Sequence, residues 1–366
     1  MNVLGIETSC DECAAAVVVD GKKILSNVVA TQIPFHAEYN GVVPEIASRK
    51  HTEWINLVVK EALDKASVRP ADIGAVAATA HPGLLGSLLV GLNFAKAFAW
   101  ARGIPFIAVD HMLAHLYAPR LEHADSHQSV DLRSVDRPTT DLNSTSFDYS
   151  FLGLLVSGGH SFICRADNFD DITILGATID DAVGEAFDKV SKFYGFGYPG
   201  GAVIDKLAKT GNPEAFNFPL PSLHKGDHKY DMSYSGLKTA AVNQLDKFYR
   251  GKDQGNGSPM KYAPEDIAAS FRKTAVAILL RSLFRIVEDL QLKTIIAGGG
   301  VAANSYLRAA LAERKDLTCV FPPLELCGDN GAMIAGLAYQ YLERGEKSSL
   351  RASASARVKS FKRRYP

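Results

Sequence analysis

Two histidines four residues apart, in the segment HMLAH from His111 to His115, are the residues of this chain best suited to binding a metal ion. On a helix, positions i and i+4 lie on one face, so two neutral imidazoles can reach the same divalent ion. The isolated carboxylate of Asp329, in the run LCGDNGAMIAG, can supply a third ligand. Two histidines and one carboxylate leave coordination positions open for a substrate oxygen, as a catalytic metal site requires. We therefore expect one divalent metal, Fe²⁺ or Zn²⁺, although histidines at this spacing also occur as ordinary surface or capping residues.

Two glycine-containing segments could bind an anion or a nucleotide. In LLVSGGHSFICRA, which starts at Leu154, an apolar strand breaks at residues 157–159 and then resumes, which predicts a hairpin. Glycines in such a turn let backbone N–H groups converge on an anion, although a plain β-turn has the same pattern. In TIIAGGGVAANSYLR, a strand over residues 294–297 runs into glycines 298–300 and then into a helix. This segment lacks the spacing of a dinucleotide-binding fold and the Gly-Lys-Ser/Thr of a P-loop.

Length and composition predict a globular protein of about two domains, because the chain has 366 residues and is 47% hydrophobic. No apolar run reaches the roughly 18 residues that a membrane span needs. Met1 leads directly into an apolar strand without a leader pattern, so we expect a cytoplasmic protein. The five cysteines are too few, and odd in number, for a disulfide framework, so reduced thiols are expected.

The chain divides into four parts. Residues 1–120 and 149–346 each open with a strand, a small polar turn and another strand, and each ends in a strand and a Gly/Ala-rich helix. This restart predicts an α/β fold of two duplicated actin-like (ribonuclease H-like) halves, with mixed sheets flanked by helices and a central cleft; the terminal helix could pack on the first half. The metal ligands would then come from opposite halves. Residues 121–148 contain few apolar side chains, which predicts a flexible insertion or linker, and a further loop is expected near 251–259.

Residues 347–366 form a basic tail, with seven basic side chains and no acidic one. A cluster of this kind can neutralise the phosphates of a nucleic acid. A frayed, solubilising terminus is the alternative interpretation.

Ten segments, in order over nearly the whole chain, resemble those of the tRNA adenosine threonylcarbamoyltransferases, the bacterial TsaD group with its archaeal, eukaryotic and mitochondrial relatives. They are GIETSCDE near the N-terminus, GVVPEIASRKH (41–51), PGLLGSLLVG (82–91), HMLAH, LVSGGHS, DDAVGEAFDKV (180–190), GYPGG (197–201), YSGLKTA (234–240), GGVAAN (299–304) and GDNGAMIA (328–335). The resemblance implies transfer of a threonylcarbamoyl group from threonylcarbamoyl-AMP to N6 of adenosine 37, in tRNAs that read codons beginning with A, with release of AMP.

The resemblance also implies which residues form the site. The metal ligands are His111, His115 and Asp329. The phosphate and acyl group would be bound by Leu155, Val156, Ser157, Gly158 and Gly159. The adenylate would be bound by Asp188, Gly201, Asp205 and Asn304. A metal ion there would polarise an oxygen of the threonylcarbamoyl group, and carboxylates can accept hydrogen bonds from ribose hydroxyls.

The base that collects the proton of the attacking amine has no clear sequence signature. Asp11 and Glu12, in the first hairpin, are candidates, and so is His160 beside the glycine turn. A solvated turn is the alternative for the two acids. The sequence departs from the family pattern at His81, where a glycine is usual, and at Leu113, where an acidic residue is frequent in bacterial members; neither change removes a ligand.

Two other activities fit parts of the pattern. A metalloendopeptidase needs H-E-x-x-H, but the residue after the first histidine is Met112. A kinase or ATPase of the actin fold would use Mg²⁺ rather than two imidazoles. The resemblance implies tRNA and threonylcarbamoyl-AMP as substrates, and as protein partners an inactive paralogue (TsaB type) and a P-loop ATPase (TsaE type), with a homodimer as in mitochondrial members as the alternative. No membrane partner is expected, because no apolar run is long enough for a span.

Overall fold

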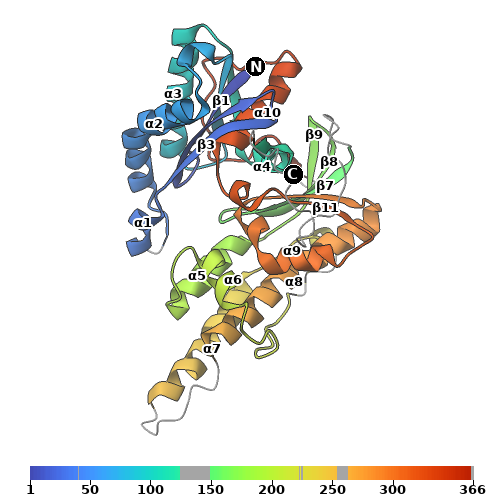
Figure 1. Cartoon of the computed structure of the whole chain (residues 1–366). Helices are drawn as coiled ribbons and strands as arrows, with labels where there is room; N and C mark the ends of the chain where they lie inside the picture. Colours follow the sequence, from blue (N-terminus) through green and yellow to red (C-terminus); the bar gives the residue numbers. More distant parts are fainter. Residues whose placement is uncertain (40, 124–148, 222, 224–225, 254–262, 364–366) are drawn as a thin grey trace. The chain divides into compact units, whose positions relative to one another are not determined.

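The computed structural model describes residues 1–39, 41–123, 149–221, 223, 226–253 and 263–363 (Figure 1). The chain forms two compact units, which are described separately: unit 1 is Met1–Ser146 with Phe321–Phe361, and unit 2 is Phe147–Val320 with Lys362–Pro366. Most of the predicted insertion at 121–148 and of the predicted loop at 251–259 lies outside the described residues. No helix in the described part of the chain is long and apolar enough to cross a membrane.

Unit 1 contains a six-stranded sheet with the order β5-β4-β1-β2-β3-β6. Its strands are β1 (Asn2–Glu7), β2 (Glu12–Val19), β3 (Lys23–Thr31), β4 (Ala75–His81), β5 (Phe106–Asp110) and β6 (Glu122–His123). Strands β1, β2 and β3 are antiparallel neighbours, whereas β4 runs parallel to β1, β5 parallel to β4, and β6 parallel to β3. The central strands are buried apolar runs, as expected where helices cover both faces.

Helices cover the two faces of this sheet in a way that follows from strand alternation (Figure 1). Leu4 and Ile6 of β1 pack in one cluster with residues of α2 (Pro44–Ala66) and α3 (Leu85–Arg102). Gly5 points to the other face, against α10 (Gly331–Glu343), where an added Cβ would lie 2.2 Å from the Gly331 carbonyl oxygen. A glycine is therefore required for α10 to approach the sheet. The remaining helices of unit 1 are short: α1 (Ile33–His36) and α4 (His111–Tyr117).

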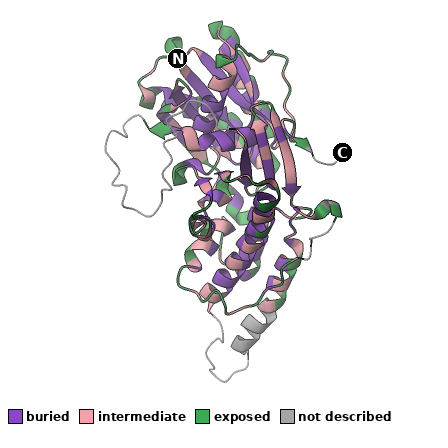
Figure 2. Cartoon of the chain, turned by 90° about the vertical axis from the view of Figure 1, so that its right-hand side faces the viewer, coloured by how far each residue is buried: buried purple, intermediate pink, exposed green. Residues whose placement is uncertain are grey.

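Unit 2 repeats the same strand plan, with the order β11-β10-β7-β8-β9-β12. Its strands are β7 (Phe151–Val156), β8 (Ser161–Asn168), β9 (Asp171–Ala177), β10 (Thr294–Gly298), β11 (Thr318–Val320) and β12 (Lys362–Arg363). Strands β7, β8 and β9 are antiparallel, and β10 and β11 continue in parallel on the β7 side. The helices are α5 (Val183–Tyr194), α6 (Gly200–Leu207), α7 (Ser235–Asp253), α8 (Pro264–Leu290) and α9 (Ser305–Ala312). Figure 2 shows that most strand residues are buried or half-buried and that most exposed residues lie on helices and loops.

The predicted α/β fold with duplicated strand order is confirmed, and so are the two hairpins and the helix that carries the histidines. The packing of the terminal helix α10 on the first half agrees with the expectation, whereas the boundary of the second half differs from it. The chain returns to unit 1 at Phe321, so residues 321–346 do not belong with the second half, and Asp329 lies in the same unit as the histidines. Of the two interpretations of the basic tail, the frayed terminus does not hold for residues 347–361, because they are hydrogen-bonded along unit 1 and end in the buried Phe361.

Candidate metal centre and nucleotide-binding residues

The histidine helix α4 begins where strand β5 ends. Asp110 is its N-cap, and its Oδ1 accepts hydrogen bonds from the N–H groups of Met112 at 2.8 Å and Leu113 at 3.1 Å. These bonds satisfy amides that the first turn of a helix otherwise leaves unpaired. All seven residues of α4 are buried, so the helix and both imidazoles are fixed by packing as well as by the cap.

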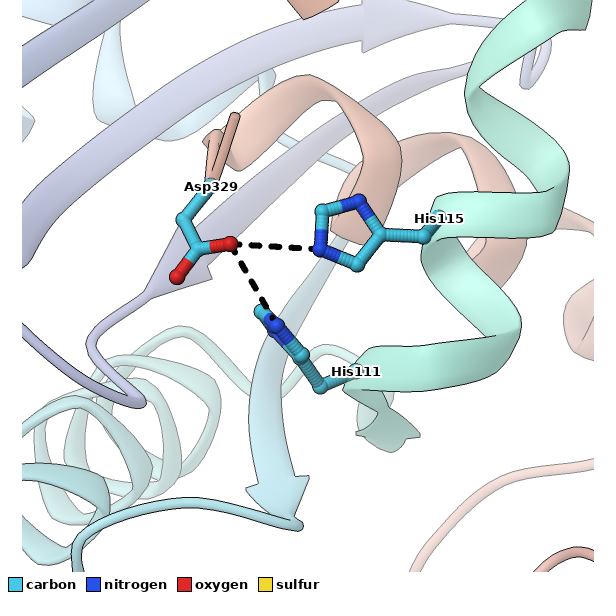
Figure 3. A group of neighbouring side chains, drawn as sticks. All are labelled: His111, His115 and Asp329. Carbon is cyan, nitrogen blue, oxygen red and sulfur yellow. Dashed lines mark hydrogen bonds and ion pairs between the residues drawn. The ribbon is translucent and has the colours of Figure 1, made fainter. Parts of the chain in front are cut away.

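The three predicted metal ligands converge within unit 1 (Figure 3). His111 Nε2 lies 3.4 Å, and His115 Nε2 3.2 Å, from the same oxygen, Oδ1 of Asp329. The three candidate ligand atoms lie within 4.8 Å of one another. Asp329 precedes Asn330, the N-cap of α10, whose Oδ1 accepts from the Met333 N–H at 3.0 Å. Packing of α10 on the sheet therefore brings this carboxylate to the histidines.

A fourth residue, Glu7, orients His111 from behind. Glu7 ends β1 and is fully buried; its Oε2 lies 3.0 Å from His111 Nδ1 and accepts a further bond from the Thr79 hydroxyl. Its Oε1 accepts the Ser9 N–H at 2.5 Å, and the Ser9 hydroxyl lies 3.3 Å from the same imidazole nitrogen. A carboxylate behind a metal-ligating histidine fixes the proton on the nitrogen that faces away from the metal. Nε2 of His111 thus faces Asp329.

The pKa directions in this cluster follow from burial and charge. Although burial works against the charged form, Asp329 and Glu7 together raise the pKa of His111 well above its usual value. Burial lowers the pKa of His115. The pKa of Asp329 is lowered, since the two imidazoles outweigh the effect of burial, and His111 likewise lowers that of Glu7. The cluster therefore carries ionised carboxylates, which favour a cation.

The donor set fits a divalent ion. Two imidazole nitrogens and one ionised carboxylate oxygen face a common point, and neutral imidazole with carboxylate suits Zn²⁺ or Fe²⁺. His115 Nδ1 is buried and has no hydrogen-bond partner in the described part of the chain. The orientation of this imidazole is therefore fixed by packing and by the contact of Nε2 with Asp329. These residues would hold the ion with coordination positions left for other oxygens.

The two acidic candidates for the catalytic base lie near this cluster. Asp11 is buried, and its carbonyl oxygen accepts the Gln32 N–H at 2.9 Å, which anchors the first hairpin turn. Glu12 begins β2 opposite Thr31, whose hydroxyl lies 3.3 Å from Oε1. Burial, with the neighbouring carboxylates of Asp11 and Asp329, raises the pKa of Glu12 to about 10. At neutral pH this group is protonated unless a nearby positive charge restores its ionisation.

The glycine turn lies in unit 2, between β7 and β8. Ser157 and His160 close it through a bond from the Ser157 N–H to the His160 carbonyl at 2.8 Å. Cβ atoms added to Gly158 and Gly159 would meet nothing within 4 Å, so the turn is open on that side. The opposite side is tightly packed, because a Cβ on Gly184 at the start of α5 would lie 2.6 Å from the Ser157 carbonyl oxygen. His160, the third candidate base, belongs to this turn.

The residues predicted for the adenylate all lie in unit 2, around the N-terminal ends of α6 and α9. Asp188 Oδ1 accepts the Gly200 N–H at 2.7 Å, and Asn304 Oδ1 caps α9 by accepting the Leu307 N–H at 3.0 Å. Gly201 has open space on the side where a Cβ would project.

Asp205 is held by two partners. It pairs with Arg272 at 2.9 Å and accepts the Ser305 N–H at 3.2 Å. These polar groups therefore already have structural partners, and a nucleotide would use their remaining acceptor capacity.

The role of Glu7 behind His111, and its bonds to Ser9 and Thr79, were missed by the sequence analysis. Each residue has a weak signal: an acidic residue at the end of an otherwise apolar strand, followed by Thr-Ser, and a threonine inside a run of alanines and valines. Buried polar residues of this kind require partners, and the structure supplies them to each other.

Duplicated sheets of this order, each with three antiparallel strands extended in parallel on one side, define an actin-like ATPase fold, here with a His-His-Asp candidate metal site. Solved structures agree on the fold. HypF, in its full-length phosphate- and nucleotide-bound form, has a TM-score of 0.54 at 14% identity, over 93% of this chain and 56% of that one. Component A of (R)-2-hydroxyglutaryl-CoA dehydratase from Acidaminococcus fermentans has a TM-score of 0.51 at 14% identity, over 94% of this chain and 99% of that one.

Sequence relatives define the family. The model of the TsaD family, tRNA N6-adenosine threonylcarbamoyltransferase, matches residues 23–130 and 139–336. A relative with that name from Treponema denticola is 61% identical over 100% of this chain and 99% of its own length. Another from Borrelia hermsii is 46% identical over 99% of this chain and 98% of its own. The chain belongs to the tRNA N6-adenosine threonylcarbamoyltransferase family and is an acyltransferase of tRNA modification.

Proposed function

We infer that the chain transfers the threonylcarbamoyl group of threonylcarbamoyl-AMP to N6 of adenosine 37, in tRNAs reading codons that begin with A. The full-length relatives support the reaction class. The convergence of His111, His115 and Asp329 is the single observation that supports a metal centre for this reaction. In the transfer, a bond forms between N6 and the carbamoyl carbon, the bond from that carbon to the phosphate oxygen breaks, and AMP leaves. The amine proton passes to a base.

Different residues of the chain would bind different parts of the donor, threonylcarbamoyl-AMP. We assign the adenylate to Asp188, Gly201, Asp205 and Asn304, and the phosphate and acyl group to residues 155–159. Open space beside Gly158 and Gly159 supports close approach of an anion to the turn. An ion held by the metal centre would supply Lewis-acid polarisation of an oxygen on the threonylcarbamoyl group. We propose Fe²⁺ or Zn²⁺ as that ion, on the donor set alone.

We propose Glu12, Asp11 and His160 as candidates for the group that accepts the amine proton. Glu12 is favoured by its position within the electrostatic reach of Asp329, and Asp11 by its position beside Glu12. Separate Glu12→Gln, Asp11→Asn and His160→Ala variants distinguish them, because loss of a general base lowers turnover by roughly 10²–10⁴-fold without removing the metal. A variant that keeps wild-type turnover excludes the substituted residue as the general base.

For protein partners we propose an actin-like paralogue of TsaB type and a P-loop ATPase of TsaE type. Two neighbouring helices expose large apolar side chains: Leu57 on α2 is 66% exposed, and Leu85 and Leu89 on α3 are 52% and 42% exposed. Exposed apolar side chains on adjacent helices support contact with another chain. A homodimer would use the same surface. Sedimentation of the pure chain, alone and with the paralogue, separates the two assemblies, and Leu57→Glu should weaken whichever one forms.

The activity is tested by incubating the pure chain with unmodified tRNA and an enzyme that generates threonylcarbamoyl-AMP, with and without both partners. We expect threonylcarbamoyladenosine in the digested tRNA for the wild type and none for His115→Ala. Phosphorylated product with ADP would instead identify a kinase, and a cleaved peptide a metalloendopeptidase. The absence of the modified nucleoside in every combination would refute the proposed function.

A further inference from the structure

The C-terminal residues 347–361, here named the strap, are fixed along one edge of unit 1. The Ser348 N–H donates to the Phe106 carbonyl at 2.8 Å, and the Ser355 N–H donates to the Ala80 carbonyl at 2.9 Å. The strap is also held laterally, since the Lys96 ammonium donates to the carbonyl oxygen of Ala352. It is therefore an ordered part of unit 1.

The strap runs toward the metal centre. Phe106 begins β5 and Ala80 lies near the end of β4, and these two strands are parallel, so the strap passes from the N-terminal to the C-terminal edge of the sheet. At that edge the Ser360 hydroxyl lies 3.5 Å from His81 Nε2.

His81 connects the end of the strap to the histidine helix. Its Nε2 lies 3.6 Å from Oδ2 of Asp110, the residue that caps α4 immediately before the ligand His111. The strap thus ends beside the helix that carries the metal-binding histidines.

The exposed side of the strap is cationic. No acidic residue occurs from position 347 to the end of the chain. Lys347, Arg351, Arg357 and Lys359 are all exposed, and none forms an ion pair with a carboxylate of the described residues. Between Arg351 and Arg357 every residue is alanine or serine, so no large side chain of the strap lies between these two arginines. Unpaired cations on a backbone that is held in place favour phosphate groups.

We propose that the strap binds the phosphodiester backbone of the tRNA and guides the acceptor toward the metal centre. The proposal rests on the proposed function, which makes RNA the acceptor, and adds where unit 1 contacts it. Because the contacts would be to phosphates, they position the RNA without reading its sequence. An acidic protein would suit the same charge, but only the RNA has to reach the end of the strap, where α4 begins.

The test compares two variants that each remove two positive charges from unit 1. Arg357→Gln/Lys359→Gln alters the strap, and Lys60→Gln/Lys65→Gln alters exposed lysines of α2 that are paired with Asp64 and Glu61. Affinity for unmodified tRNA is measured over a range of NaCl concentrations, with full-length protein and the partners that activity requires. Metal content is measured in parallel.

For the strap variant we expect at least a tenfold loss of affinity at low salt. We also expect a plot of log affinity against log salt that is shallower by about 1.4–1.8, since each lost phosphate contact contributes roughly 0.7–0.9. Metal content and the α2 variant should match the wild type. A strap variant with the wild-type slope, an α2 variant that changes equally, or loss of a protein partner with tRNA binding intact would overturn the proposal. A wild type that binds no tRNA would instead contradict the proposed function.

Discussion

Glu7 accepts a hydrogen bond from Nδ1 of His111 at 3.0 Å, while Nε2 of the same ring points to Asp329. The bond places a proton on Nδ1, so that Nε2 is the nitrogen that can bind a metal. The carboxylate itself is fixed, because Ser9 and Thr79 donate to its two oxygens. A buried residue outside the proposed ligand set would thereby decide which nitrogen of the imidazole is presented to an ion.

Glu7→Gln should lower metal affinity by about 10–100-fold. The Ser9 N–H keeps the glutamine oxygen on its own side, which turns the amide NH₂ toward His111 Nδ1. Nδ1 would then accept a hydrogen bond and Nε2 would carry the proton, which blocks the metal-binding position. Metal titration with a competing chelator measures the affinity, and nitrogen NMR of the metal-free protein identifies the protonated nitrogen.

Thr79→Val is the matched control, since it removes a bond to Glu7 from the same buried cluster and leaves the Glu7–His111 bond in place. Its metal affinity should remain within a few-fold of the wild type. Equal losses in both variants would mean that Glu7 acts only through the stability of the unit.

Metal affinity should rise with pH by about tenfold per unit near neutrality, because binding displaces one proton. Glu7 and Asp329 raise the pKa of His111 above its usual value, so this imidazole is protonated at pH 7 in the absence of metal. His115 and Asp329 have lowered pKa values, so neither has to release a proton when the metal binds. Chelator competition at pH 6.5, 7.5 and 8.5 measures the slope, and a pH-independent affinity would contradict the protonated state of His111.

Relative to the wild type, Glu12→Gln should stabilise the metal-free protein by an amount that grows with pH above about pH 5, by up to about 1.4 kcal/mol per pH unit, while reducing activity. The pKa of Glu12 rises from 4.5 to about 10 on folding, owing to burial and to Asp11. The folded state therefore binds this proton more tightly, so the stability it contributes is complete below pH 4.5 and is lost as pH increases toward 10. Glutamine does not titrate. Denaturant unfolding at pH 5 and pH 8 should give a difference between variant and wild type that grows with pH; an equal difference at both values would exclude a raised pKa.

Asp188→Ala and Asn304→Ala should weaken adenylate binding and leave the metal content intact, because both residues lie in unit 2 and the proposed metal ligands lie in unit 1. Each should also cost about 1 kcal/mol of stability, since each side chain accepts a backbone N–H at a helix end. Calorimetric titration with AMP measures the affinity, and unchanged values in both variants would remove these residues from the nucleotide site.

Local pattern was sufficient to predict most elements of the fold. The apolar strands that flank a small polar turn appear as β1–β2 and β7–β8, and the spacing of His111 and His115 was enough to place both rings on one face of α4. These features depend on residues close together in sequence. The duplication was visible for the same reason, because each half repeats its own local order of strands.

Long-range packing accounts for what the sequence did not predict. Asp329 belongs to unit 1 because α10 packs on Gly5. The sequence left this packing open as one possibility, because a glycine inside a strand does not identify a helix more than 300 residues away, and the ligands were expected from opposite halves. Glu7 reads as the polar end of a strand, and its burial depends on β2 and β4 flanking β1. The strap has few apolar side chains, so no periodicity indicated that serine hydrogen bonds would fix it.

The most direct test of the account follows isotope-labelled threonine from threonylcarbamoyl-AMP into unmodified tRNA, with AMP measured in the same reaction. The wild type, supplied with metal and partners, should place one label on N6 of adenosine 37 for each AMP released, and His115→Ala should place none. Release of AMP without label in the tRNA, or full transfer by a metal-free His115→Ala protein, would contradict a threonylcarbamoyl transfer centred on His111, His115 and Asp329.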